Sequence, residues 1–592
     1  MSLQPRILPR PVSPAVFQAA RDHGYTELQA RLIAARLPDA DAGRVATLIR
    51  PALGTLTSPW RLPDIRPAVS AIVDAIVEGR HLVCASDYDC DGSSAATVVL
   101  RAMRDYFGVP ADRIRHVIAH RQRDGYGLSN NVADKLLDEL PPNSLVCTCD
   151  QGSADEARIA RLAAAGHTVV VTDHHGIPAE GPPPSAIACV NPVRTDSQFG
   201  DPYIAGCVVA LLVMAAVRQG LIERGYLTAS APKLTPLLQF AGTAVIADCV
   251  SLGRSANNRA IVAAALAQIN GDAAFPCWRA FRELTGLHRP LNAQDLAFTA
   301  VPMINASGRM AHADASLAWL MADDDATALA ALKVLHAHNE ERKTTERAMV
   351  AALRPHALEL AGQGASTVCL LQPEGSQGVM GVVAARMVEA TGRPAAVFVA
   401  KQGQPDVITG SFRSVPGVHI RQALADVDAS HPHIFAGHGF GGHEGAAGAH
   451  LALEHYPDFL VAIDEAVRRQ VDPAGLSPTT WVDAPPGRPL TLDLLAEISP
   501  LEPFGRGWEL PVFALEATIA GVKVMGQDRT HLRLDLVADG RTYEAVWFRA
   551  MEPGQDPPVR PGEVRLFAVE PGENSFRGRT RLQLLVRQVV PV

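Results

Sequence analysis

Three aspartates at alternate positions, Asp87, Asp89 and Asp91, follow directly after the apolar run LVCAS and precede Gly92. The run predicts a buried strand, and the small and apolar residues after Gly92 predict a helix. In open α/β sheets, functional side chains collect at the carboxyl ends of strands, where these carboxylates would lie. Carboxylates so close together repel one another unless a cation lies among them, and crowded oxygen ligands suit Mg²⁺ or Mn²⁺. A turn that caps a helix is the alternative, because aspartate is a favoured N-cap residue, and the triplet alone leaves both interpretations open.

Acidic and histidine side chains also follow later apolar segments. Asp150 ends the run LVCTCD, the triplet Asp173-His174-His175 ends TVVVTDHH, and Asp248 follows FAGTAVIA. Adjacent histidines after a β-branched run indicate ligand or catalytic roles, with capping again as the alternative. The repetition over four segments favours a shared site, because independent helix capping would not require histidine at the third.

The elements that must position these residues alternate between helices and short apolar strands. Helices are expected over 65–78, 93–106, 131–139 and 153–165, and strands over 81–86, 114–119, 144–149 and 168–172. Strands alternating with helices predict an α/β fold with a doubly wound, parallel sheet.

The remainder of the chain predicts further domains. Residues 327–362 are rich in strong helix formers and indicate a long connecting helix, and strands over 367–371 and 395–400 indicate a second, smaller α/β domain. Short alternating runs after residue 510 predict a β-barrel of OB type. The residues up to about 63 are expected to be helical and auxiliary, and their early prolines are typical of a mobile lead-in. The expected parts are an auxiliary segment (1–50), the first α/β domain (51–318), the connecting helix (319–362), the second α/β domain (363–475) and the barrel (476–592).

The composition limits the class of protein. The 592 residues, 47% hydrophobic and 20% charged, are enough for several globular cores. A net charge of −8 means that a nucleic-acid partner would need a local basic groove. Nine cysteines without a disulfide-like spacing indicate reduced thiols in the cytoplasm. No signal-like N-terminus is seen, and the apolar segment 204–217 is too short to span a bilayer, so no membrane association is expected.

One basic cluster lies close to the C-terminus. Arg577, Arg579 and Arg581 surround Phe576 on the expected last hairpin of the barrel. Basic residues beside an aromatic ring suit single-stranded nucleic acid, since bases stack and phosphates pair. An ordinary solvated hairpin is the alternative.

The four acidic and histidine segments resemble the motifs of the DHH phosphoesterase superfamily, in the form DYDCDG, CTCD, DHH and VIADCV. Further segments lie in the order found in the bacterial single-stranded-DNA exonucleases of that superfamily: RQRDGYGLS, VNP, NNRAIV, INASGRM, SQGVMGVVAARM, GSFRS, FGGHEGAAG and PLEPFGRGWELPVF. The resemblance runs from about residue 50 to the end of the chain. It implies a DHH domain with a parallel sheet, a connecting helix, a DHH-associated domain and an OB-fold.

The resemblance also implies two divalent ions, Mn²⁺ or Mg²⁺, which activate a water and neutralise the phosphate oxygens in phosphodiester hydrolysis. It assigns Asp89 and Asp248 to one ion. It assigns Asp91 and His174 to the other ion, with Asp150 as the bridge. The full set of expected ligands is Asp87, Asp89, Asp91, Asp150, His174 and Asp248.

Catalytic and phosphate-binding roles follow from the same resemblance. Asp150 is expected to be essential, His175 to contact the substrate phosphate or shuttle a proton, and Asp173 to orient the histidines. Glycines 441 and 442 would let the backbone approach a phosphate. The residues expected to form a pocket for a terminal 5′-phosphate are Arg121, Arg309, Ser411, Arg413 and His443.

The expected function is therefore 5′→3′ hydrolysis of single-stranded DNA to 5′-mononucleotides, in recombination and repair. A single-strand-binding protein and a RecQ-type helicase are the implied partners, and the expected state is a monomer. Two alternatives remain: a DHH phosphodiesterase for short oligonucleotides or cyclic dinucleotides, and a catalytically inactive DNA-binding scaffold. Two positions depart from the superfamily pattern: Ser376 replaces a usual histidine, and Gln151 replaces the commoner asparagine.

Overall fold

The structure, a computed structural model, describes every residue except 1–4, 121–124, 126, 249, 311–313 and 577–578, and it leaves out the side chains of 474, 575 and 576. Two compact units divide the chain. The first unit comprises Gly43–Arg342 and Glu502–Glu509, and the second comprises Met1–Ala42, Lys343–Leu501 and Leu510–Val592.

A parallel five-stranded sheet, in the order β3-β2-β4-β5-β6, organises the first unit. Strands β2 and β4 are buried at every position, which explains why their sequences are continuously apolar instead of alternating. The pairing aligns Ser86 with Cys149 and Cys149 with Thr172, so three neighbouring strands end at the same level. The bounds are β2 (Leu82–Ser86), β3 (Ile114–Ile118), β4 (Leu145–Cys149), β5 (Thr168–Thr172) and β6 (Ala188–Val190).

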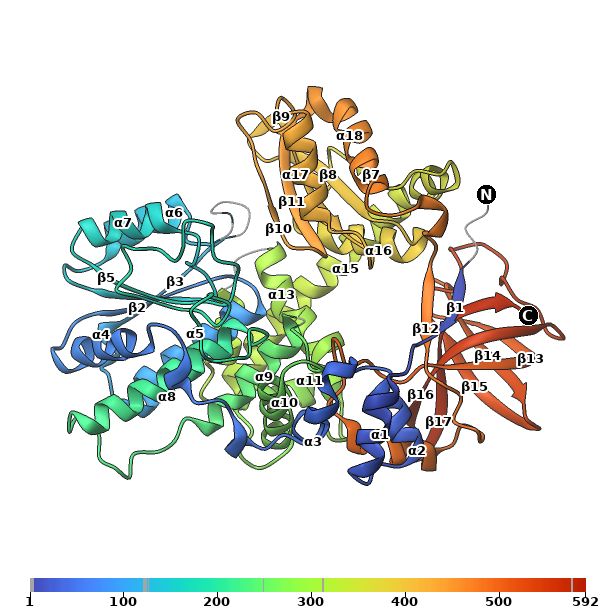
Figure 1. The fold of residues 1–592 in the computed structure, drawn as a ribbon, viewed down its shortest axis with the longest axis horizontal. Coiled ribbons are helices and arrows are strands. Elements are labelled where there is room, and N and C mark those ends of the chain that lie inside the picture. The colour runs from blue at the N-terminus through green and yellow to red at the C-terminus, as the bar shows by residue number, and fades with distance from the viewer. Residues whose placement is uncertain (1–4, 121–124, 126, 249, 311–313, 577–578) are drawn as a thin grey trace. The chain divides into compact units, whose positions relative to one another are not determined.

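Helices cover both faces of this sheet, as the alternating pattern predicts (Figure 1). Two of them, α6 (Asn130–Glu139) and α7 (Glu156–Ala164), pack together on one face. The other face carries α4 (Ile65–Val77), α5 (Cys90–Arg101) and α8 (Gly206–Glu223).

Helix α8 is, within the described part of the chain, the one helix long and apolar enough to cross a membrane, with a mean hydropathy of 1.7. Its apolar window is 67% buried inside the protein, against α4, α5 and the sheet. A helix that is apolar on all sides is expected in such a position. We therefore assign α8 to the core of the first unit.

The rest of the first unit is helical. Its remaining α-helices are α3 (Val45–Ile49), α9 (Leu238–Ala247), α10 (Ala256–Ile269), α11 (Pro276–Thr285), α12 (Ala293–Asp295), α13 (Val301–Met310) and α14 (Asp314–Leu320). The segment Glu502–Glu509 returns to this unit from late in the sequence. Arg259, 1% exposed, donates to the carbonyl oxygen of Pro503 at 3.1 Å and lies 4.7 Å from the ring centroid of the fully buried Trp508.

The long connecting helix is present as α15 (Asp325–Gly362), and it passes from the first unit into the second at Arg342. Beyond it lies a mixed five-stranded sheet in the order β10-β11-β9-β8-β7. The bounds are β7 (Val368–Leu371), α16 (Met380–Thr391), β8 (Ala395–Lys401), β9 (Gln404–Arg413), α17 (Ile420–Ser430), β10 (Phe440–Gly442), β11 (Ala446–Ala452) and α18 (Tyr456–Arg468). This is the predicted second α/β domain.

The predicted barrel is also present. After α19 (Leu492–Ile498), five strands close in the order β13-β14-β15-β17-β16. Their interior positions alternate with exterior ones along β13, which accounts for the alternating sequence. The bounds are β13 (Phe513–Met525), β14 (His531–Ala538), β15 (Arg541–Trp547), β16 (Val564–Phe576) and β17 (Arg579–Pro591).

The prediction of a mobile N-terminal lead-in is wrong for the residues described there. Strand β1 (Arg6–Pro9) pairs in parallel with β12 (Thr479–Val482), and α1 (Pro14–Asp22) and α2 (Glu27–Ala34) follow. Arg36 forms a fully buried ion pair with Asp483 at 2.8 Å. The prolines are compatible with this order because they lie at the end of the strand and at the start of α1, where a missing N–H costs little.

Candidate metal centre

Strand register brings the first three acidic segments to one edge of the sheet. Asp87, Asp150 and Asp173 each follow one of the three strand-end residues that are register partners. Asp150 has a φ of 62°, a left-handed backbone that is uncommon for a residue other than glycine. Such backbone strain is typical of functional sites, and here the chain turns sharply as it leaves the strand.

In the first motif, Asp89 caps a helix and Asp91 lies buried at the site. Asp89 is the N-cap of α5 and accepts a hydrogen bond from the Gly92 amide at 3.0 Å, so the capping alternative holds for this residue. Asp91 is 1% exposed, and its two oxygens accept from the amides of Gly206 and Cys207 at 2.8 Å each. Because these amides begin α8, the positive end of that helix stabilises the buried carboxylate.

Asp248 reaches the site from a helix. It is the C-cap of α9, a helix buried over most of its length, and not the end of a strand. The apolar segment before it resembles a buried strand in composition because α9 packs against both α5 and α8.

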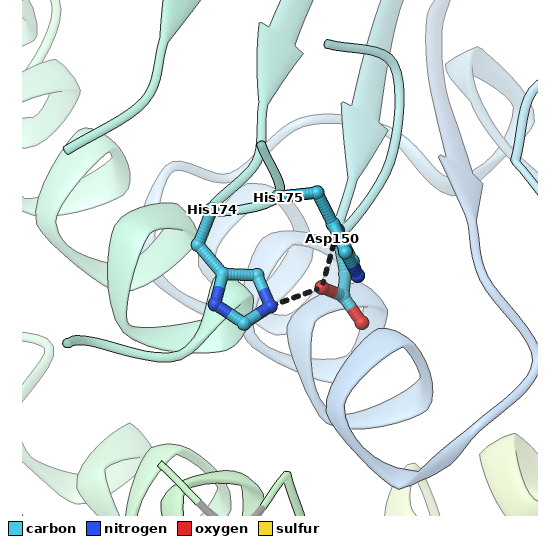
Figure 2. A group of neighbouring side chains, drawn as sticks. All are labelled: Asp150, His174 and His175. Atoms are coloured by element: carbon cyan, nitrogen blue, oxygen red, sulfur yellow. Dashed lines mark ion pairs between the residues drawn. The ribbon is translucent and has the colours of Figure 1, made fainter. Parts of the chain in front are cut away.

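His174 lies close to three carboxylates, and Figure 2 shows it and His175 beside one of them, Asp150. Its Nε2 lies 3.2 Å from Asp150 Oδ1, 3.6 Å from Asp248 Oδ2 and 3.7 Å from Asp91 Oδ2. His175 Nδ1 lies 2.7 Å from Asp173 Oδ1 and 3.9 Å from Asp150 Oδ1. The two imidazoles therefore approach Asp150 from different sides.

At this edge of the sheet, the ligand atoms of the described residues fall into three overlapping groups, each with all its atoms within 4.8 Å of one another. One group joins Asp150 to both histidines. The others are Asp91 with His174 and Asp248, and Asp87 with Asp89 and Asp150. This grouping places Asp248 with Asp91, whereas the resemblance pairs it with Asp89, so the assignment of ligands to individual ions stays a prediction.

These residues fit divalent ions. Asp150 Oδ1 and His174 Nε2 are buried and make no hydrogen bond within the described part of the chain, which is costly unless a cation satisfies them. Carboxylate oxygens supplemented by imidazole suit Mn²⁺ or Mg²⁺. The overlap of the groups at Asp150 and His174 is compatible with two ions that share ligands.

The pKa shifts of the acidic residues also indicate that a positive charge belongs at this site. Burial raises the pKa of Asp150 well above its usual range, and the neighbouring carboxylates of Asp91 and Asp89 raise it further. Burial, with Asp91 and Asp89, also raises the pKa of Asp248 to about 7. For His174 burial opposes the charged form, but the carboxylates of Asp248 and Asp91 outweigh it and raise the pKa.

Asp173 orients the two histidines through hydrogen bonds. Its Oδ1 accepts from the His174 amide at 2.7 Å and the His175 amide at 3.1 Å, and its Oδ2 accepts from the Ser153 amide at 2.9 Å. Burial alone would raise the pKa of Asp173, but the hydrogen bond and charge of His175, together with His174 and Ser153, outweigh it and the pKa is lowered. In turn Asp173 overcomes the effect of burial on His175 and raises the pKa of that imidazole to about 10.

Several positioning residues were not singled out from the sequence, although two of the quoted motifs contain them. Asn305, in INASGRM, accepts a hydrogen bond from the Cys90 amide at 2.8 Å, and Gly308 packs closely on Tyr88. Asn191, in VNP, donates to the His175 carbonyl at 2.8 Å. Gly206 lies against Asp150, and nothing in its sequence context indicated this contact.

The expected phosphate-binding residues are divided between the units. Ser411 and Arg413 lie on β9, opposite Gly448 and Ala446 of β11, and the His443 amide donates to the Ala446 carbonyl at 2.7 Å. These three residues therefore meet at one end of the second sheet, beside the start of α16, where Gly381 packs on Arg413. Arg309 is on α13 of the first unit, and Arg121 lies outside the described residues, so the complete pocket stays a prediction.

The remaining residues of interest lie elsewhere. Arg579 and Arg581 are exposed on β17, whereas Arg577 and the Phe576 side chain lie outside the described residues. Gln151 donates to the Ala85 carbonyl at 3.0 Å and so ties the turn at Asp150 to β2. Ser376 lies in the turn before α16.

Matches to protein-family models identify the class of protein to which this chain belongs. The family model of the DHH family, N-terminal domain, matches residues 81–238, and the model of the DHHA1 domain matches residues 363–469. Fold and site together therefore define a DHH phosphoesterase. The RecJ OB domain matches residues 486–588.

Relatives identify the family within this class. The single-stranded-DNA-specific exonuclease RecJ of Dickeya dadantii is 30% identical over 90% of this chain and 91% of its own length, and that of Escherichia coli is 30% identical over 90% and 92%. The chain belongs to the RecJ family. The crystal structure of RecJ in complex with Mn²⁺ from Thermus thermophilus matches 99% of this chain and 79% of that chain, with 26% identity and a TM-score of 0.75.

We predict that stabilisation by Mn²⁺ increases with pH. In the metal-free protein the raised pKa of Asp248, about 7 against an ordinary 3.8, means that the unfolded chain loses this proton first, so the folded state loses stability as the pH rises through that window. Bound ions reverse this penalty and require deprotonated ligands. The rise in melting temperature on adding Mn²⁺ should therefore be several degrees larger at about pH 8 than at about pH 5.5. A shift of equal size at both pH values would contradict the prediction.

Proposed function

We propose that this chain is a two-metal exonuclease that degrades single-stranded DNA from its 5′ end and releases 5′-mononucleotides. The observation that carries the proposal is the convergence of Asp91, Asp150, His174 and Asp248 in a chain of the RecJ family. Both alternatives are less favoured. The C-terminal barrel is unnecessary for a dinucleotide, and an inactive scaffold would not need buried carboxylates whose repulsion destabilises the metal-free protein.

The residues divide the chemistry between them. Divalent ions bound in this centre would supply an activated water and neutralise the phosphate oxygens. Asp150 and His174, which the distances place in more than one group, hold the centre together. His175, held through Nδ1 by Asp173 and 45% exposed at the side chain, contacts the scissile phosphate or moves a proton.

Recognition of the strand end rests on a second set of groups. Arg413, Ser411 and His443, together with the backbone amides that begin α16, supply charge and donors for a terminal 5′-phosphate. A requirement for that terminal phosphate restricts hydrolysis to the 5′ end of the strand, as removal of one nucleotide at a time needs. The exposed Arg579 and Arg581 of the barrel contact the backbone of the strand, in keeping with the need for a local basic groove on an acidic protein.

The proposal predicts the polarity of degradation. A 5′-label on a long single strand should appear as mononucleotide in the first cycles, whereas a 3′-label should remain on progressively shorter strands. Removing the 5′-phosphate, or replacing Arg413 with alanine, should slow degradation by roughly tenfold or more, because a charged hydrogen bond to phosphate is lost. Early release of the 3′-label, or faster hydrolysis of a dinucleotide than of the long strand, would contradict the proposal.

The same proposal places the protein in recombination and repair, as a cytoplasmic monomer that works with a single-strand-binding protein and a RecQ-type helicase. A reducing compartment is supported by the cysteines, since all eight that the structure describes are buried and free of disulfides. The helicase would supply single strands, which are the substrate. Size-exclusion chromatography with light scattering tests the monomer, and pull-down with each purified partner tests the associations.

A further inference from the structure

A second group of ligand-type side chains lies in the DHHA1 domain, within the second unit. His433, His455 and Asp458 each offer a ligand atom, and these atoms all lie within 4.8 Å of one another. His433 Nε2 is 3.5 Å from Asp458 Oδ2, and the rings of His433 and His455 are 5.3 Å apart between centroids. None of these residues belongs to the proposed nuclease or phosphate-binding sites.

The distance between His433 and Asp458 fits two ligands of one metal ion better than a direct hydrogen bond between the two side chains. The 3.5 Å between His433 Nε2 and Asp458 Oδ2 is longer than an ordinary N–H···O hydrogen bond, which spans roughly 2.7–3.2 Å. It is close to the edge of a tetrahedron with ligands about 2.0–2.1 Å from its centre, which is roughly 3.4 Å. The pair therefore already has the separation that two ligands of one tetrahedral ion would show.

The core holds the backbone of two of these ligands in place. His433 is followed by Ile434 and Phe435, which are 0% and 4% exposed, and Asp458 is followed by the fully buried Phe459. The rings of Phe435 and Phe459 pack edge to face with centroids 6.0 Å apart. The packing of Phe435 on Phe459 therefore holds the turn after α17 against the first turn of α18, while the ligand side chains face outward.

His455 and the surrounding histidines complete the chemistry. His455 lies immediately before α18, and its side chain is 29% exposed. His431 is a neighbour, with its ring centroid 6.1 Å from that of His433. Seven of the 20 histidines of the chain lie between His419 and His455, and histidine-rich tracts are a sequence sign of metal binding.

We propose that His433, His455 and Asp458 form a Zn²⁺ site, with His431 or water as the fourth ligand. Two imidazoles and one carboxylate favour Zn²⁺ over Mn²⁺ or Mg²⁺, which prefer oxygen-rich centres such as the one in the first unit. The ion ties the turn that follows α17 to the start of α18. Because that same turn leads into β10 and His443, Zn²⁺ stabilises the segment that carries part of the proposed phosphate grip.

Zinc stoichiometry of the full-length protein tests this proposal. Wild type, His433→Ala/His455→Ala and the control His356→Ala, an exposed histidine on α15, are each dialysed against Zn²⁺ in excess Mn²⁺, and bound zinc is measured by elemental analysis. Wild type and the control should bind one more Zn²⁺ per chain than the double variant. Since all three chains keep the nuclease centre, zinc bound there cancels in the comparison.

Further readouts separate ligation from folding. In excess Mn²⁺, Zn²⁺ should raise the melting temperature of wild type and of the control more than that of the double variant, whose Mn²⁺-dependent nuclease activity, measured without Zn²⁺, stays at the wild-type level. The conservative Asp458→Asn should weaken Zn²⁺ binding at least tenfold with an unchanged circular dichroism spectrum. Equal zinc content in wild type and the double variant, or unchanged Zn²⁺ affinity in Asp458→Asn, overturns the proposal.

Discussion

Replacing Asp150 with alanine is expected to abolish hydrolysis of single-stranded DNA while the protein stays folded. Asp150 Oδ1 lies 3.2 Å from His174 Nε2, and Asp150 belongs to two of the three ligand groups of the centre. Its loss should reduce the rate well beyond the roughly 10–100-fold that loss of a ligand's hydrogen-bond partner typically costs. The measurement is the initial rate of mononucleotide release from a 5′-phosphorylated strand with saturating Mn²⁺.

Stability should change in the opposite direction. Because burial and the carboxylates of Asp91 and Asp89 raise the pKa of Asp150, alanine removes an unfavourable buried charge, and the metal-free variant should unfold at a temperature at or above that of wild type. The increase in melting temperature on adding Mn²⁺ should shrink. Asp138→Ala, which removes an exposed carboxylate from α6, is the matched control and should leave both quantities unchanged. Wild-type activity in Asp150→Ala would rule out the proposed centre.

The second large effect is expected at Gly206, a residue with no reactive group. A Cβ added there would lie 2.5 Å from Asp150 Oδ1 and 2.9 Å from Asp150 Cβ. The side chain of Asp150 has little room to retreat, since the residue is 2% exposed. Gly206→Ala should therefore displace the carboxylate by a few tenths of an ångström or more, and misplacement on the scale of 1 Å costs about 10²-fold in rate.

A matched glycine separates geometry from helix propensity. Gly54 has no atom within 4 Å of a Cβ added to it, so Gly54→Ala should retain full activity. Alanine at 206 would otherwise be expected to stabilise α8, because it is the better helix former. If Gly206→Ala keeps wild-type activity and Mn²⁺ affinity, Asp150 does not need the position that it has in the structure, and its assignment as the shared ligand fails.

The strands and the polar residues at their ends could be predicted from the sequence alone. The runs before Asp87, Asp150 and Asp173 are apolar throughout because both faces of a parallel sheet are covered, and this pattern is local enough to be read directly. The alternation of apolar and polar residues along β13 likewise predicts a barrel strand, because one face of the strand lies inside the barrel. The resemblance of the motifs to the DHH superfamily then identified the class, which the family models confirm.

The helices that meet these strand ends could not be predicted from the sequence and are known from the three-dimensional structure. It places Asp248 at the end of α9, sets Gly206 against Asp150, pairs β1 with β12 and brings His433 beside Asp458. In each case, the residues on either side in the sequence do not indicate which distant residue will lie close by. A strand or helix is specified by residues within a few positions of one another, whereas the helix end that meets a given strand end depends on the packing of the entire core.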